Sequence, residues 1–465
     1  MTNFFQTARK AILFSLVFLV FPFFANAQEQ RQRLSPDEAV SLAIRNNLTL
    51  ESSRVSTSTR KRKADNAWNV FIPTVDLSTS LSGTLNKPEA PQPIPLIPNM
   101  PPISLMPQTP QWSSTLPSIS VTWQNLNVAL FEGMKAVKED YAIGVLSYEK
   151  AKAQIERDVR KAYYNILLLY ENISLLKESF KSAERRVDMA QANYRAGRAP
   201  ELTYLQAQVA MENMKPTINQ AENGLRVSMV QFAIMLGLPY DTDFELIPIE
   251  SISDFVELDV KEIISNASRS KPDILEIKQN IRFLESRRKA TFYQLHTPNL
   301  MIGWSIGPTI WNDVSGWNWN DGWKNTNAGR LTIALSFRLN TLLPFGSEQS
   351  GLKDIDDNLR SLQIGLAQSI RGTELEIYSI ILDLEKVQTT IEAQKRTVEL
   401  AERSFRLTET AYRAGLQDLL EVQNAELELR KARIGILEQN FTYLRALIDL
   451  EYAMGVPFGT LSGSL

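Results

Sequence analysis

The sequence predicts a mainly helical fold in which a long helical hairpin carries one pair of short β-strands, and this whole unit occurs twice. Three observations lead to the prediction. The chain of 465 residues contains only 20 glycines, a low number that favours helix. Landmarks in the later part of each copy return at a constant offset of 218 positions. Within each copy, the apolar spacing changes from about 3.6 to about 2 and back, as in helix, strand and helix.

Composition excludes several classes of function. The 50 Lys and Arg residues are matched by 52 Asp and Glu residues, so there is no basic excess of the kind that nucleic-acid binding requires. The absence of cysteine excludes thiolate metal sites, iron–sulfur clusters and cysteine nucleophiles. The single histidine, His296, lies at an expected helix-to-strand boundary, and no phosphate-binding loop or nucleophile elbow is present. We therefore predict no catalytic, metal or cofactor-binding residues, and no enzyme.

Residues 1–27 have the three parts of an export signal. Arg9 and Lys10 form a basic start, residues 11–24 form an apolar run, and Ala25-Asn26-Ala27 matches a cleavage site. A membrane anchor is the alternative, but the run is short for a span of about 20 residues. The sequence thus predicts an exported protein that begins at Gln28 after cleavage.

The repeat is carried by two motifs. Tyr194-Arg195-Ala196-Gly197 returns as Tyr412-Arg413-Ala414-Gly415, and Gly237-Leu238-Pro239 returns as Gly455-Val456-Pro457. Both pairs are separated by 218 positions, without a gap between the two motifs. The predicted organisation is a first repeat at 28–240, a linker at 241–267, a second repeat at 268–457 and a tail at 458–465.

Each copy is expected to open with a helix. Ser35 is a candidate N-cap, Pro36 suits the first helical position, and Glu38 completes a capping box. Helical sequence then continues to about residue 68. In the second copy, the matching helix is expected from Pro272 until Pro298.

After these helices, apolar side chains alternate with small or polar ones, which predicts strands at about 74–85, 117–128, 299–308 and 330–341. A sandwich or a sheet on a helical core is one interpretation. The other is a transmembrane β-barrel, which strands of about 10 residues can build. The export signal favours the barrel, and so do Asp76 and Arg338 on the polar face, because a wet interior suits them better than a packed core.

Long helical hairpins follow at 134–238 and 347–455. In the second hairpin, an apolar stripe runs from Ile355 to Phe405 with a mean spacing of 3.57 residues, close to the values for coiled coils and straight helices. A helix from Ser347 to Tyr412 would be ~100 Å long, too long for a compact core. Asp418 is the expected N-cap of the returning helix.

Two loops between paired strands have unusual composition. Residues 87–110 include nine prolines, which predicts extended coil. Residues 311–323 include four tryptophans, which suit loop packing and an interfacial girdle, or binding of sugars or lipid headgroups.

Four strands cannot close a barrel, and an open sheet edge in lipid leaves unpaired amides that cost several kcal/mol each. Two chains would give eight strands, whose side chains nearly fill the interior. Three chains would give twelve strands around an open lumen. We therefore expect a homotrimer with a 12-stranded transmembrane β-barrel above a periplasmic α-barrel.

The ordered set of motifs resembles the TolC family of outer-membrane efflux proteins over residues 34–460. The opening Leu34-Ser35-Pro36-Asp37-Glu38-Ala39, the duplicated Tyr-Arg-Ala-Gly turns and the endings Leu236-Gly237-Leu238-Pro239 and Met454-Gly455-Val456-Pro457 carry the resemblance. It implies a passive exit duct in the outer membrane of a Gram-negative-type bacterium, with a large periplasmic part. The implied partners are outer-membrane lipid, a periplasmic adaptor (membrane fusion) protein and an inner-membrane pump of the RND, ABC or MFS type. Family members export drugs, metals, small molecules or, in type I secretion, proteins, and the substrate of this chain stays open.

The resemblance also implies two sets of site residues. Adaptor-docking tips fall on Ala196, Gly197, Arg198, Ala414, Gly415 and Leu416. A periplasmic gate that uses a Tyr, an Arg and two Asp in known members falls on Tyr412, Gln417, Glu421 and Asn424. Because the cation and one carboxylate are missing here, the family's ion-pair latch is in doubt.

Glu421 retains its carboxylate, so three chains would present a ring of three at the periplasmic end. Such a ring would make the pore cation-selective. The plainer interpretations are that Glu421 is a solvated surface residue and that the tip glycines merely close the hairpins. A coiled-coil scaffold or surface adhesin without a pore is the alternative function.

Overall fold

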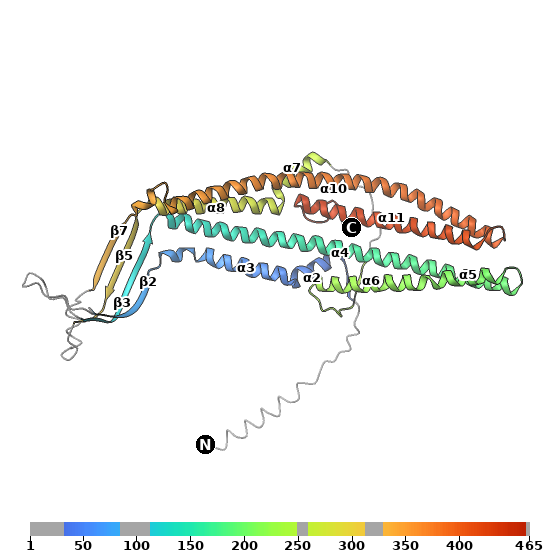
Figure 1. Ribbon diagram of the computed structural model, residues 1–465, viewed down its shortest axis with the longest axis horizontal. Helices are drawn as coiled ribbons and strands as arrows, with labels where there is room; N and C mark the ends of the chain where they lie inside the picture. Colours follow the sequence, from blue (N-terminus) through green and yellow to red (C-terminus); the bar gives the residue numbers. More distant parts are fainter. Residues whose placement is uncertain (1–31, 84–111, 249–258, 312–328, 462–465) are drawn as a thin grey trace, which may run out of the picture.

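A computed structural model describes residues 32–83, 112–248, 259–311 and 329–461 (Figure 1). The described chain is long and narrow, with a β-sheet at one end and two helical hairpins that run away from it (Figure 1). The export signal at 1–27, the Pro-rich loop at 87–110 and all but Trp311 of the Trp-rich loop lie outside the described residues.

The same order of elements occurs twice, as the sequence repeat predicts. The first copy consists of α2 (Pro36–Asn46), α3 (Leu48–Asp65), η1 (Ala67–Phe71), β2 (Thr74–Gly83), β3 (Trp112–Leu126), α4 (Ala129–Arg195), α5 (Glu201–Glu212) and α6 (Met214–Met235). The second consists of α7 (Val260–Ser270), α8 (Pro272–His296), β5 (Asn299–Ile306), β6 (Thr309–Trp311), β7 (Arg330–Ser336), η2 (Leu339–Leu342), α10 (Ser347–Arg413) and α11 (Leu419–Met454). Helix α7 crosses the predicted boundary at residue 267, so the second copy begins earlier than the sequence suggests.

The first helical stretch begins as predicted, but it is divided into separate helices. Ser35 and Glu38 form the capping box: the Glu38 N–H donates to Ser35 Oγ (3.3 Å), and the Ser35 N–H donates to Glu38 Oε2 (2.8 Å). Helical structure continues past residue 68 as predicted, to Phe71 at the end of η1, but Asn47 interrupts it. Its side-chain Oδ1 accepts the N–H of Thr49 (2.9 Å) and of Leu50 (3.2 Å), which starts α3 as a new helix.

The returning helix of the first hairpin is also interrupted, although the long hairpin predicted at 134–238 implies one unbroken returning helix. Helices α5 and α6 are separated at Asn213, and Pro216 is the third residue of α6. Proline lacks an N–H and its ring clashes with the carbonyl four residues earlier, here that of Glu212. Pro216 therefore accounts for the break, whereas α11 in the second hairpin is continuous.

The four expected strands form one antiparallel sheet in the order β2-β3-β5-β7, with β6 continuing alongside β3. Strand β3 begins at Trp112, five residues before the predicted start. Strand β7 ends at Ser336, five residues before the predicted end, and residues 339–342 form a 3₁₀ turn instead. The buried Thr341 stabilises this turn, since its hydroxyl oxygen lies 2.6 Å from the Arg338 carbonyl oxygen and 2.9 Å from that of Leu295.

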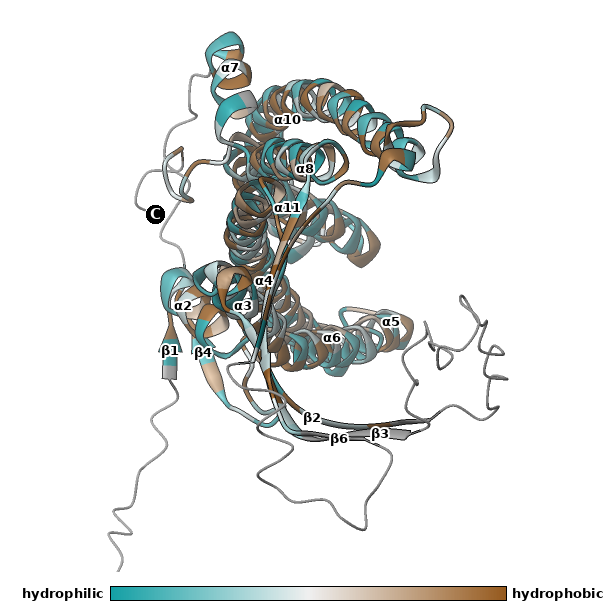
Figure 2. Ribbon diagram, turned by 90° about the vertical axis from the view of Figure 1, so that its left-hand side faces the viewer, coloured by the Kyte–Doolittle hydropathy of each residue, from teal (hydrophilic) through white to brown (hydrophobic). Residues whose placement is uncertain are grey.

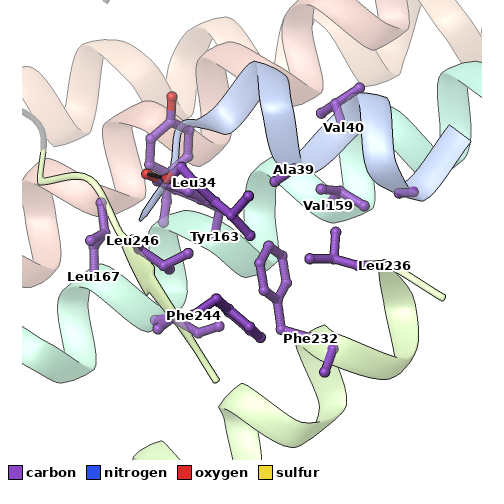
Figure 3. Packing of buried hydrophobic residues seen from close by; sticks show 14 of the residues in the cluster. Leu34, Ala39, Val40, Val159, Tyr163, Leu167, Phe232, Leu236, Phe244 and Leu246 are labelled. Carbon is purple, nitrogen blue, oxygen red and sulfur yellow. Dashed lines mark hydrogen bonds between the residues drawn. The ribbon is translucent and has the colours of Figure 1, made fainter. Parts of the chain in front are cut away.

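A compact core lies midway along the hairpins, where β1 (Gln32–Leu34) pairs in parallel with β4 (Phe244–Leu246). Tyr163 is fully buried, and its hydroxyl oxygen lies 2.9 Å from the Leu34 carbonyl oxygen and 2.8 Å from that of Ile247. Phe232 from α6 and Phe244 pack beside it (Figure 3). The predicted linker at 241–267 thus contains β4 and most of α7, and β4 joins the first described strand, β1, to the core of the hairpins. Seen along the long axis, α2, β1, β4 and α7 lie on one side of an arc of helices (Figure 2).

The repeated Gly-x-Pro motif has a structural reason in both copies. Gly237 has a φ of +71°, and a Cβ atom there would lie 2.6 Å from the Asn46 carbonyl oxygen. Gly455 has a φ of +65°, and a Cβ atom there would lie 2.8 Å from the Ser270 carbonyl oxygen. Each glycine therefore lets the end of a long helix abut the junction between the two short helices of its own copy.

Candidate functional site: the sheet and the hairpin tips

The sheet has one apolar and one polar face. Val75, Val121, Trp304 and Leu331 are paired across the four strands, and the next apolar row includes Leu77 and Ile119. Most of these side chains are exposed, and Leu77 reaches 74 %. Exposed apolar rows of this length fit a lipid environment rather than water.

The opposite face carries small and polar side chains. One row across the sheet consists of Asp76, Ser120, Ser305 and Arg330, so the two charges stand at its two edge strands. Strands β2 and β7 are the ends of the strand order in the described sheet, and each has a free edge. None of the helices in the described residues is long and apolar enough to cross a membrane.

The hairpins connect the sheet to the far end of the molecule. Helices α4 and α10 have 67 residues each, which corresponds to ~100 Å. Their returning partners pack along them through apolar stripes, which in α10 include the buried Ile377, Leu384 and Ile391. The sheet and the hairpin tips therefore mark the two ends of one elongated body (Figure 1).

The six predicted tip residues lie in two equivalent turns at the end opposite the sheet (Figure 1). In the first turn, Gly197 has a φ of +70° and the Arg198 N–H donates to the Asn193 carbonyl (2.8 Å). In the second turn, Gly415 has a φ of +74° and the Leu416 N–H donates to the Ala411 carbonyl (2.9 Å). A Cβ atom at either glycine would meet nothing within 4 Å, so both turns are open on the outside. Ala196 and Ala414, the C-cap residues of α4 and α10, are exposed as well.

The four predicted gate residues have different environments. Tyr412 is half-buried and packs on a small cluster that joins the two hairpins, formed by Ala190, Ala207 and Leu419. Burial raises the pKa of the Tyr412 phenol, although Arg186 opposes this effect. The other three gate residues, Gln417, Glu421 and Asn424, are exposed in the single chain, with Glu421 and Asn424 three residues apart on α11.

The structure places a buried ion pair close to this cluster, which the sequence interpretation did not find. Arg186 on α4 is only 4 % exposed, and its Nη2 donates to Glu426 Oε2 on α11. The other guanidinium nitrogen, Nη1, is buried without a hydrogen-bond partner. Burial raises the pKa of Glu426, and Arg186 acts against that shift. The pair therefore joins the two hairpins about 14 Å from the first tip, as nine helical residues separate Arg186 from Arg195.

A signal for this pair is present in the sequence. Arg186 lies between Ala183 and Ala190 in the buried stripe of α4, and Glu426 lies between Val422 and Leu429 in that of α11. A charged residue within an apolar stripe is expected to be buried and paired. What the sequence does not supply is which partner faces it.

His296 has a structural environment, as its sequence position suggests. Its ring stacks on Phe292 with centroids 4.2 Å apart, and its Nδ1 lies 2.9 Å from the Phe292 carbonyl oxygen. Among the described residues, no cluster of three or more His, Cys, Asp or Glu side chains could hold a metal ion.

Comparison with known proteins gives a consistent result. The model of the family described as outer membrane efflux protein matches residues 39–238 and 315–456. No curated protein sequence matches the chain. Among solved structures, CusC, a protein studied for transmembrane channel formation, has a TM-score of 0.72 and 16 % identity, covering 91 % of this chain and 92 % of that one.

Two other solved structures are similar. The Campylobacter jejuni outer membrane channel CmeC has a TM-score of 0.72 and 15 % identity over 90 % of this chain and 85 % of its own. The open state of the Neisseria gonorrhoeae outer membrane channel MtrE has a TM-score of 0.68 and 15 % identity, over 90 % of this chain and 89 % of its own. At these identities the structures show the shared fold, and the family model carries the assignment.

Proposed function

Because the chain belongs to the outer membrane efflux protein family, we propose that it works as a passive homotrimeric exit duct for a tripartite efflux pump or a type I secretion system. The chain is an outer-membrane protein with a large periplasmic helical part. The observation that carries the proposal is the four-stranded sheet, with exposed apolar rows on one face and free edges at β2 and β7, set on hairpins of ~100 Å.

The free edges support the trimer. An unpaired strand edge in lipid costs several kcal/mol for each unsatisfied amide, so β2 of one copy has to pair with β7 of the next. The strand order alternates in direction, which makes this pairing antiparallel like every other pair in the sheet. Eight strands from two copies would nearly fill their own interior, whereas twelve from three copies leave a lumen.

The hairpin tips are the proposed docking points for a periplasmic adaptor, which in turn joins an inner-membrane pump. Leu416 and Leu202, at or near the tips, expose apolar side chains at the end of the molecule farthest from the membrane. Exposed apolar residues at a helix-hairpin end suit contact with another protein. We assign the resting closure of this end to Tyr412, Gln417, Glu421 and Asn424.

The test is deletion of this protein in its own bacterium, together with purification of the tagged full-length protein from cross-linked cells. We expect an adaptor and an inner-membrane pump to copurify. Sensitivity of the deletion strain to dyes and detergents would indicate small-molecule efflux, and loss of one secreted protein would indicate type I secretion. An unaltered strain, together with a tagged protein that is monomeric in outer-membrane extracts, would contradict the duct.

A further inference from the structure

The helices that enter the sheet carry exposed basic residues just before the strands begin. Near its end, helix α3 carries Arg60, Lys61, Arg62 and Lys63, which are followed by Ala64 and the exposed Asp65, and it leads through η1 into β2 (Figure 1). Arg60 is neutralised, since its Nη1 lies 3.0 Å from Asp140 Oδ1 on α4. Lys61, Arg62 and Lys63 are exposed and form no ion pair within the described part of the chain. Arg62 turns back to Ser58 and Thr59 hydroxyls instead.

The second copy repeats this arrangement on α8, which leads into β5. Here Arg288 is the neutralised residue, and it pairs with Asp356 on α10. Its neighbours Arg287 and Lys289 are exposed and form no ion pair with any residue of the described ranges. In the part of the chain that the structure describes, both copies thus present exposed basic residues without an ion pair at the same level.

Exposed aromatic residues separate the basic residues from the strands in both copies. Trp68 follows Lys63 by five residues and is 57 % exposed, and Phe292 follows Lys289 by three and is 41 % exposed. Trp68 lies ~10 Å closer to the sheet than Lys63, from the rise of helical and 3₁₀ turns. The exposed apolar strand rows come next. The order basic, aromatic, apolar is the order of phosphate, interface and hydrocarbon across one membrane leaflet.

We propose that Lys61, Arg62 and Lys63, with Arg287 and Lys289 as their counterparts, form a collar that binds the phosphates of anionic phospholipids in the periplasmic leaflet of the outer membrane. Three consecutive residues of a helix point about 100° apart, so at least one of Lys61, Arg62 and Lys63 faces outward whatever the helix orientation. The inference rests on the proposed barrel, because the barrel sets the leaflet at this level. Basic side chains beside an anionic membrane surface attract it over about one Debye length.

The collar has a plain physical role. Hydrophobic matching of its apolar band holds a barrel at a given depth only weakly against small shifts, because mismatch costs only about a fraction of a kcal/mol per Å. Phosphate contacts at one leaflet, with Trp68 at the interface above them, fix the depth at which the periplasmic hairpins start. The tips then stand at a defined distance from the membrane.

The collar is tested by native mass spectrometry of the purified full-length protein with equal amounts of phosphatidylglycerol and phosphatidylcholine. We expect wild type to retain phosphatidylglycerol preferentially. We expect the K61Q/R62Q/K63Q variant to lose at least about tenfold of this preference, because at least one of the three removed charges faces the membrane surface. The R287Q/K289Q variant, which removes two charges, should lose a smaller part of the preference for phosphatidylglycerol. The matched control K395Q/R396Q/R403Q removes three exposed charges far along α10 and should leave the preference unchanged.

Two outcomes would overturn the collar: equal retention of both lipids by wild type, or the same loss in the distal control as in K61Q/R62Q/K63Q. The same spectra report the mass of the assembly. Absence of a trimer in wild type would count against the proposed duct, whereas an intact trimer without lipid preference counts against the collar alone.

Discussion

Arg186 occupies a position where the α4 stripe would otherwise hold an apolar side chain, and its charge is balanced by one carboxylate. Removing one member of a buried pair leaves the other charge uncompensated, which costs ~3–5 kcal/mol. We expect Arg186→Met to destabilise the helical part by about that amount, and Arg186→Met with Glu426→Leu to restore most of it. Thermal and denaturant unfolding followed by circular dichroism at a helix wavelength measures both.

The control for this pair is Lys431→Met on the same helix α11. Lys431 pairs with Glu428 at the surface, where both side chains are more than half exposed, so its loss should cost well under ~1 kcal/mol. Equal effects of Arg186→Met and Lys431→Met would show that the buried pair does not join the hairpins.

The glycines of the repeated motif predict a position-dependent effect of one methyl group. Gly237→Ala places a Cβ against the Asn46 backbone at a positive φ, so we expect a loss of more than ~1–2 kcal/mol in stability. Gly224→Ala, within α6 and with nothing within 4 Å of its Cβ, should instead stabilise by ~0.5–1 kcal/mol. The unfolding midpoints of the two variants, measured under the same conditions, test this prediction. A stability change of the same sign in both variants would contradict the close approach of Gly237 to the Asn46 backbone.

At the scale of elements, the hairpins were predictable because apolar periodicity and a duplicated turn do not depend on distant contacts. Helices α10 and α11 begin and end within one residue of the expected positions. Helix α8 begins at the expected Pro272 and ends at His296, two residues before Pro298. The breaks at Asn47 and Asn213 were missed, although Asn47 is a recognisable N-cap and Pro216 a recognisable helix breaker. In both places, the apolar pattern continues through the break and conceals it.

The end of β7 and the partners of buried charges could not be predicted from the sequence, because they depend on contacts between residues far apart in the chain. Thr341 forms its turn through a hydrogen bond to Leu295, 46 residues away in sequence, and Arg186 meets Glu426 at a separation of 240. Contacts of this kind depend on how helices are placed against one another. One sequence without its fold does not define that placement.

The sheet supports a prediction about its two faces. Ile333 is in the middle of β7 on the apolar face, and Thr332 beside it points to the polar face opposite Gly303. If the apolar face meets lipid, Ile333→Arg costs ~2–4 kcal/mol near the bilayer midplane and Thr332→Arg is tolerated in the lumen. Folding into vesicles, monitored by gel mobility before and after heating, measures the two variants. Leu335 and Ser336 provide a second such pair nearer the strand end.

The hairpin turns support a prediction about docking. Gly415→Trp and Gly197→Trp add a bulky side chain into open space at a positive φ, so the fold away from the tips should persist. We expect barrel assembly to be unchanged, and export, measured as resistance of the deletion strain carrying each variant, to be abolished. Full export with either substitution would remove these turns from the docking surface.

At the scale of the whole assembly, Glu421 is the one residue of the proposed gate with a carboxylate. Three copies would bring three such groups around a narrow opening, which attracts cations. We expect cation selectivity in planar bilayers and a conductance that falls with millimolar divalent cations, and we expect this block to be absent in Glu421→Gln. Identical block in both proteins would leave closure to Tyr412 and helix packing.

The interrupted helix of the first hairpin makes the two arms of each chain mechanically unlike. The second arm is a pair of unbroken rods, because α11 has no gap between Leu419 and Met454. The first hairpin has a helix break at Asn213, where Pro216 removes a backbone hydrogen bond of the returning helix. A force applied at the tips would therefore bend the first hairpin at this break, while the second hairpin transmits the force along its full length. In a ring of three chains, rigid hairpins would alternate with hairpins that can bend. The helical tube would then deform at three evenly spaced positions rather than uniformly.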